Sequence, residues 1–451
     1  MDNDSKQKRG TFSSSIGFIL SAAGAAIGLG NLWKFPYVAG ANGGGLFILF
    51  YIMFSIILGI PITLVEMSVG RKTQLSAAAA YKKLNPKWTF VGTLGVICSF
   101  VLLCYYSVVG GWVIKYFLSY LFNTNFETDK IAFFEQFTKS TFEPSLYAVL
   151  FIIVSTAIVL LGISKGIEKA SKIMLPTLFI LLAVIAVQSI TLPNSSEGLK
   201  FIFAPNFKAV DSFQHLMQTL IAALSQSFFS LGLGMGITIT YGSYLSKEEN
   251  MPKSSVWVAF LDIVISLLSG TAIIPAVFSF GFEPTSGPGL MFHTLPAVFE
   301  SMPFGKILGF IFFILVFFAA LTSAMASLEV VSAALIDRFN FSRHKATISM
   351  AIIIAVISIL VSLSNGLLSN IKIMGMILFD FLVYITDKIF MPIAAILTCI
   401  FVGYVLKTKN LVKEIEIGSN HFHYAKSLDI IMKYIAPIFI SIVLVLGIIQ
   451  I

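Results

Sequence analysis

The stretches Gly24-Ala-Ala-Ile-Gly-Leu-Gly-Asn31 and Phe229-Ser-Leu-Gly-Leu-Gly-Met-Gly236 decide the fold of this chain. Each lies in an apolar segment long enough to cross a bilayer, with no charged residue from 10 to 33 or from 216 to 245. Glycine weakens a helix and frees backbone carbonyls, which membranes tolerate only where they line a polar site inside the protein. Two interrupted helices, half a chain apart, are typical of the binding site of secondary transporters.

The composition predicts a membrane protein. The chain has 451 residues, of which 57% are hydrophobic and 12% charged, and its mean hydropathy is +0.91. These values exclude an ordinary soluble fold and predict many apolar spans. We expect eleven spans, at 12–38, 44–70, 89–122, 145–162, 167–192, 215–245, 255–281, 306–336, 346–366, 371–405 and 428–451.

The positions of Lys and Arg predict the orientation. Most of them lie at the N-terminus or in the even-numbered connections, such as 71–88 and 406–427. Because such residues favour the cytoplasmic side, we expect a cytoplasmic N-terminus and an outside C-terminus in a bacterial inner (plasma) membrane. This asymmetry accounts for the +8 net charge, so nucleic acid is not an expected partner. No cleaved signal peptide is expected, and the sequence does not indicate an oligomeric state.

The two interrupted stretches divide the chain. We expect a cytoplasmic N-terminus and a first five-helix repeat over 1–192, and a second, inverted repeat over 193–405. A cytoplasmic loop and the eleventh span would follow over 406–451. The Pro- and Gly-rich connection 282–303 suggests either a re-entrant lid or a solvated loop.

The sequence resembles the neurotransmitter:sodium symporter family. The resemblance rests on Gly24-Ala-Ala-Ile-Gly-Leu-Gly-Asn-Leu-Trp-Lys-Phe-Pro36, Asn42-Gly-Gly-Gly45 and Gly59-Ile-Pro61 ahead of Glu66 and Gly70-Arg71. Within the family it is most similar to eleven-span bacterial members, including sodium-dependent tyrosine carriers. The resemblance implies an all-α, LeuT-type 5+5 inverted-repeat bundle with broken helices 1 and 6. It also implies sodium-coupled import of an L-amino acid by alternating access, and no enzyme activity.

The resemblance further implies two sodium ions, which prefer oxygen ligands such as freed carbonyls and hydroxyls. The first site would comprise Ala26, Asn31, Ser230 and Asp262. The second would comprise Gly24, Ile27, Ala319, Thr322 and Ser323. From the residues alone, Thr322 and Ser323 suit such a site, but hydroxyls that bond back to their own helix are the alternative.

Asp262 is a carboxylate within an apolar span, which is costly in a membrane and indicates a function. The chloride cage of animal relatives would correspond to Tyr51, Gln226, Ser230 and Ser266. We hypothesise that Asp262 supplies the negative charge instead, so that no chloride is required. After sodium leaves, Asp262 could return as the neutral acid and export a proton. The alternative is a helix-end aspartate that faces water.

The absence of a carboxylate at position 28 indicates the class of substrate. Monoamine carriers of the family have an aspartate where this chain has Gly28, so the substrate is expected to bring its own carboxylate. The resemblance implies the binding residues Ala25, Ala26, Gly28, Leu29, Gly30, Leu102, Tyr106, Val109, Phe229, Ser230, Gly232, Met235, Ser323 and Ser327. Small Gly232 and Ser327 beside the adaptable Met235 favour an aromatic side chain, with tyrosine first. An aliphatic amino acid is the alternative.

Two charge pairs are predicted to gate the site. Outside, Lys34 would pair with Asp380, although Asp387 lies on the same span. Inside, Arg9 would pair with Asp337, above Ser243, Tyr244 and a packed Phe12. Charges that extend to the membrane surface are the alternative for each pair.

Three other classes of protein are alternatives to a transporter. A channel would use symmetric loops rather than two opposed gates, and a membrane enzyme would need a metal, carboxylate or nucleotide motif that the sequence lacks. A non-transporting amino-acid sensor on the same fold remains an alternative.

Overall fold

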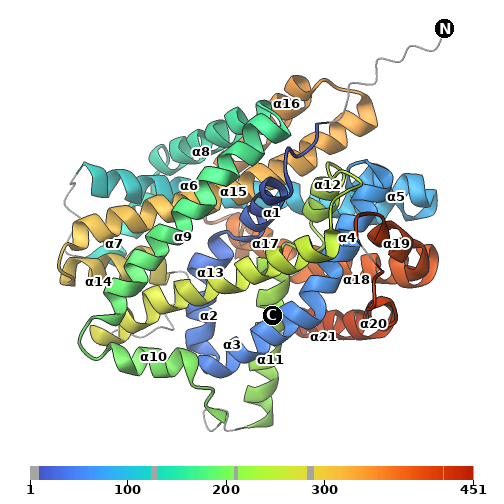
Figure 1. Ribbon diagram of the computed structural model, residues 1–451. Helices are drawn as coiled ribbons and strands as arrows, with labels where there is room; N and C mark the ends of the chain where they lie inside the picture. The colour runs from blue at the N-terminus through green and yellow to red at the C-terminus, as the bar shows by residue number, and fades with distance from the viewer. Residues whose placement is uncertain (1–9, 123–128, 208–211, 282–288, 420, 450–451) are drawn as a thin grey trace.

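The computed structural model describes residues 10–122, 129–207, 212–281, 289–419 and 421–449. The chain forms a bundle of long, obliquely crossing helices, with one short hairpin (Figure 1).

The first half contains five predicted spans and their connecting helices. The spans are α1 (Ser15–Ala26) with η1 (Gly30–Lys34) and α2 (Phe35–Ala41); α3 (Gly45–Phe54) with η2 (Ser55–Gly59) and α4 (Ile60–Thr73); α6 (Thr89–Leu121); α8 (Glu143–Leu160); and η4 (Ile163–Glu168) with α9 (Lys169–Ile190). The connecting elements are α5 (Ala77–Leu84), η3 (Pro86–Trp88), α7 (Lys130–Lys139) and α10 (Ser195–Phe203).

The second half contains the other six. The spans are α11 (Phe213–Ser230) with α12 (Ile237–Gly242); α13 (Met251–Ser279); α15 (Gly305–Phe339); α16 (Arg343–Leu363); α17 (Leu378–Tyr384) with η7 (Ile385–Phe390), α18 (Met391–Ile400) and η8 (Phe401–Leu406); and α20 (Ala425–Ile430) with η10 (Ile431–Ile435) and α21 (Ala436–Ile449). The connecting elements are η6 (Leu290–Thr294), α14 (Leu295–Ser301), β1 (Lys372–Ile373), β2 (Met376–Ile377), α19 (Thr408–Ile415) and η9 (Glu416–Gly418).

Among the described residues, nine helices are long and apolar enough to cross a membrane, and the bent pair 15–41 makes ten. The sixth predicted span, 215–245, is present as α11 and α12, which are separated by 231–236 and are not among those ten. The prediction that the tenth span begins at 371 was wrong, because 372–377 form an antiparallel hairpin.

The first and sixth spans break where the glycines lie. α1 ends at Ala26, and the chain bends by 53° before the helix continues at Gly30. Between α11 and α12, Gly232, Gly234 and Gly236 have φ angles of 62°, 79° and 73°. Residues other than glycine rarely adopt such angles, so these three glycines end α11. The Ser227, Phe228 and Phe229 carbonyls then accept from backbone N–H groups of the turn at 231–233.

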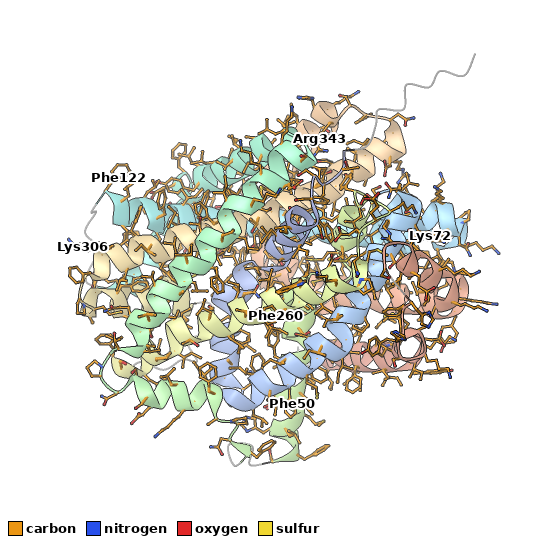
Figure 2. All side chains as sticks on the ribbon, viewed as in Figure 1. Phe50, Lys72, Phe122, Phe260, Lys306 and Arg343 are labelled. Atoms are coloured by element: carbon orange, nitrogen blue, oxygen red, sulfur yellow. The ribbon has the colours of Figure 1, made fainter. Side chains whose placement is uncertain are left out.

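The outside of the bundle is apolar and its centre is polar. Phe122 and Phe260, labelled in Figure 2, are 70% and 50% exposed, whereas Asn31 and Asp262 are fully buried. This distribution suits a lipid environment around an internal polar site. In the described part of the 282–303 connection, Leu290, Phe292 and Leu295 are each at most 2% exposed, whereas Glu300 is exposed.

Candidate functional site

A small cavity lies at the breaks of the first and sixth spans, and α6 and α15 complete its walls. Its lining contains every predicted substrate-binding residue except Val109, and adds Ile237. The full lining is Ala25, Ala26, Gly28, Leu29, Gly30, Leu102, Tyr106, Phe229, Ser230, Gly232, Met235, Ile237, Ser323 and Ser327. Its volume of about 30 Å³ is smaller than any amino acid, so binding requires its walls to move.

Glycines let the first span approach its neighbours closely in this cavity. A Cβ on Gly28 would lie 2.5 Å from Ser323 Oγ and 2.9 Å from the Tyr106 hydroxyl. A Cβ on Gly30 would lie 2.7 Å from the Phe229 ring. The missing side chains thus bring the backbone at the break in the first span against a tyrosine and a serine.

The Leu29 N–H donates to the Tyr106 hydroxyl at 3.2 Å. Both groups can donate to a substrate carboxylate, and Leu29 lies directly before η1. A helix start favours anions, because its N–H groups and dipole point at the ligand.

The four residues of the predicted first sodium site lie together. Asn31 Nδ2 donates to Ser230 Oγ and Asp262 Oδ1, both at 2.7 Å, and Ser230 Oγ donates to the same carboxylate oxygen at 2.7 Å. Ala26 lines the adjoining cavity. Because Asp262 is fully buried, its charge requires these donors or a cation.

Three residues of the predicted chloride cage surround Asp262. The Tyr51 hydroxyl donates to Asp262 Oδ2 at 2.7 Å and lies 3.0 Å from Ser266 Oγ, and Ser230 binds the other carboxylate oxygen. Gln226 differs, since its amide donates to the Gly30 carbonyl at 2.9 Å. The Asp262 carboxylate therefore accepts from two hydroxyls of the predicted cage, while Ser266 is linked to it through Tyr51.

The residues of the predicted second sodium site also meet. Ser323 Oγ lies 3.5 Å from the Ile27 carbonyl and 3.3 Å from the Ala319 carbonyl, and a Cβ on Gly24 would contact Thr322 at 3.4 Å. Thr322 Oγ1 donates to the Ala319 carbonyl at 3.0 Å. Both hydroxyls thus bond to their own helix, as the alternative interpretation expected, while facing the break in the first span.

The outer charge pair is Lys34 with Asp387, not Asp380 as predicted. Lys34 Nζ lies 3.1 Å from Asp387 Oδ2 and 4.1 Å from the centre of the Phe229 ring. Tyr105 donates to the other Asp387 oxygen at 3.3 Å. Asp380 is exposed and lies instead in the first turn of α17, where the helix dipole favours a negative charge.

The inner side is closed by aromatic and ionic contacts. Arg9 lies outside the described residues, and Asp337 accepts from the Ser76 N–H at 2.6 Å. The Phe12 ring packs against Tyr244, with centroids 6.4 Å apart, and Ser243 is buried below.

Two buried glutamates were missed in this region. Glu329, fully buried, accepts from Tyr244 at 2.5 Å and pairs with Arg343 at 2.5 Å. Glu168 accepts from the Ser13 N–H at 2.7 Å, which fixes the segment before α1. Their signal in the sequence was an acidic residue in or beside an apolar run, the same signal that identified Asp262.

Comparisons with known proteins show the family of this chain. A model of the sodium:neurotransmitter symporter family matches residues 9–132 and 124–451. The chain belongs to this family. An uncharacterized sodium-dependent transporter of Bacillus subtilis, YhdH, is 37% identical over 447 residues, or 97% of this chain and 98% of that protein. Another, from Haemophilus influenzae, is 34% identical over 462 residues and covers 99% of both chains.

Among solved structures, the crystal structure of MhsT in complex with L-phenylalanine is similar to this symporter. The TM-score is 0.89 at 39% sequence identity, covering 97% of this chain and 99% of MhsT. The symporter therefore has the LeuT-type fold. It is a sodium-dependent, multi-pass membrane transporter of a small molecule and not an enzyme.

Proposed function

We propose that this symporter imports an aromatic L-amino acid, tyrosine first, with two sodium ions and without chloride. The observation that carries the proposal is the buried Asp262 carboxylate, which two predicted sodium ligands contact at 2.7 Å. A fixed negative charge in contact with the ligands of a cation attracts that cation without help from a mobile anion.

The lining of the cavity supports an aromatic substrate. The position of a Cβ on Gly232 lies 3.5 Å from Met235 Sδ and 3.6 Å from Ile237, so the only obstacles there are flexible side chains. Met235 can change rotamer at low cost, and Ser327 offers a hydroxyl to a phenol. The neighbour MhsT was crystallised with an aromatic amino acid.

The driving force is large enough for accumulation. Two sodium ions that move with a zwitterion through about 100 mV supply about 4.6 kcal/mol, or roughly a thousandfold gradient. Return of a protonated Asp262 would halve this electrical term, but would remove the need to return an empty charged site.

Uptake into proteoliposomes tests the proposal. Radiolabelled L-tyrosine is offered under an inward sodium gradient, with chloride replaced by gluconate, and potassium replaces sodium in the control. We expect accumulation that needs sodium but not chloride. A matched pair, Ser327→Ala and Ser327→Leu, tests the pocket: the first should weaken tyrosine more than phenylalanine, and the second should exclude both.

Other outcomes select the alternatives. Sodium-dependent uptake of leucine or alanine, without any aromatic amino acid, would replace the aromatic substrate by an aliphatic one. Sodium-dependent binding of an amino acid by folded protein, without transport of any, would identify a sensor.

A further inference from the structure

A second, larger cavity lies far along the chain from the substrate site. It has a volume of about 700 Å³ and is formed by the end of the tenth span, α19 and the start of the eleventh span. Figure 1 shows these elements together at one edge of the bundle, where α18, α19, α20 and α21 meet. The lining is Gly403, Tyr404, Lys407, Thr408, Lys409, Val412, Ala425, Lys426, Asp429, Ile430, Lys433 and Tyr434.

The walls of this cavity are held by direct contacts. The Tyr404 hydroxyl donates to the Lys433 carbonyl at 3.0 Å. A Cβ on Gly403 would lie 2.9 Å from Lys433 Cγ and 3.4 Å from Lys433 Cα, so this glycine lets η8 approach η10 closely. The cavity is therefore part of the packed structure.

The lining is strongly basic, with four lysines and one aspartate. Lys433 pairs with Asp429 at 2.7 Å, while the side chains of Lys407, Lys409 and Lys426 are exposed. Lys407 has φ 64°, a conformation that glycine adopts at lower cost.

An apolar stripe continues from the cavity along the eleventh span. Ile430 and Tyr434 line the cavity and are 51% and 55% exposed. Ile438, Ile442 and Val445 follow at helical spacing and are 58%, 45% and 52% exposed. The combination of a basic cavity with an apolar track suits a molecule with a phosphate at one end and an acyl chain at the other.

We propose that this cavity binds the phosphate headgroup of an anionic membrane lipid, with an acyl chain along the apolar stripe. The connection that carries the lysines is predicted to lie on the cytoplasmic side, where headgroups reach the ends of the spans. Phosphate needs several cationic or N–H donors, and three exposed lysines meet that need. Tyr404 and Tyr434 suit the interface, where amphipathic rings lie at the level of headgroups.

Native mass spectrometry of the full-length protein tests this site. Binding of phosphatidylglycerol is compared with that of zwitterionic phosphatidylcholine for the wild type and three triple variants. The first variant is Lys407→Gln/Lys409→Gln/Lys426→Gln, and the second carries Arg at these positions. The matched control, Lys72→Gln/Lys82→Gln/Lys87→Gln, removes the same charge on the same predicted side but outside the cavity; Figure 2 marks Lys72.

We expect the wild type, the Arg variant and the control to prefer phosphatidylglycerol, and the cavity Gln variant to bind it at least about tenfold more weakly. A shift of the melting temperature by sodium confirms that each variant is folded. Equal binding by the cavity Gln variant and the control would overturn the proposal, as would loss of binding in the Arg variant. If the wild type binds inorganic phosphate at this cavity but shows no preference for phosphatidylglycerol over phosphatidylcholine, the site takes a soluble anion and the lipid proposal is refuted.

Discussion

Asp262→Asn is the substitution that most directly tests the proposed role of the buried carboxylate. It removes one charge and keeps nearly the same volume. It also disturbs the hydrogen bonds, because the Asp262 oxygens accept from Asn31, Ser230 and Tyr51, each at 2.7 Å. An asparagine side chain offers one oxygen where the carboxylate offers two, so at least one of these donors must reorient.

The magnitude follows from the distances. A sodium ion held by Asn31 and Ser230, which both contact Asp262, would lie within about 4 Å of the carboxylate. At an effective dielectric constant of about 20, a pair of unit charges at that distance attracts by about 4 kcal/mol. Some of this is offset because a neutral amide is easier to bury. We expect sodium affinity to fall by about a hundred- to a thousandfold without chloride.

The assay is tyrosine uptake into proteoliposomes as a function of sodium, in gluconate and in chloride. The wild type should give the same sodium dependence in both anions, whereas Asp262→Asn should need much more sodium in gluconate and should recover in chloride. Asp380→Asn, which removes an exposed carboxylate, is the control and should match the wild type. If Asp262→Asn keeps wild-type sodium dependence in gluconate, the charge of Asp262 is not what replaces chloride.

Three further substitutions test other parts of the site. Asp387→Asn should slow tyrosine uptake, because it removes the charged partner of Lys34 above Phe229. Asp380→Asn should not slow it. If Asp380→Asn slows uptake and Asp387→Asn does not, the pairing predicted from the sequence is restored. Gly30→Ala should lower substrate affinity about tenfold, because its Cβ would lie 2.7 Å from the Phe229 ring. Substrate binding is measured by scintillation proximity, and unchanged affinity would show that the ring moves freely. Glu329→Gln should destabilise the protein by about 3 kcal/mol, because it leaves Arg343 without its buried partner. Thermal unfolding in detergent measures that loss, and Glu135→Gln, at an exposed pair with Lys139, should leave the unfolding curve unchanged.

The sequence predicted the helix breaks well because their cause is local. Glycines at alternate positions permit the positive φ angles of 232, 234 and 236, and the absence of charge keeps both segments within the bundle. The same reasoning failed at the start of the tenth span. Met374 and Gly375, with φ angles of 52° and 80°, form a tight hairpin turn between apolar residues, and hydropathy alone cannot distinguish that hairpin from a helix.

The lining that the family resemblance implied agrees with the cavity to within one turn of α6, and helical periodicity is consistent with it. Leu102, Tyr106 and Val109 follow helical spacing on one face of α6, but the cavity ends at Tyr106, whose hydroxyl lies at Leu29. Val109, one turn further on, is buried in the packing instead. Periodicity identifies the face of a helix, whereas the depth at which a cavity ends depends on side chains from other helices.

The outer charge pair is a second case in which the sequence identifies the face of a helix but not the depth of a contact along it. Asp380 and Asp387 are seven residues apart, so they lie on nearly the same face of a helix but about 10 Å apart along its axis. Only the depth of Lys34 decides between them, and that depth depends on how the first span bends at 53° and where η7 begins in the tenth. Because Lys34 also lies over Phe229, which contacts Gly30, the pair with Asp387 links the outer gate to the backbone of the substrate site. A pair with Asp380 would close the entrance without that link, so the choice of partner determines whether substrate binding and gate closure can be coupled.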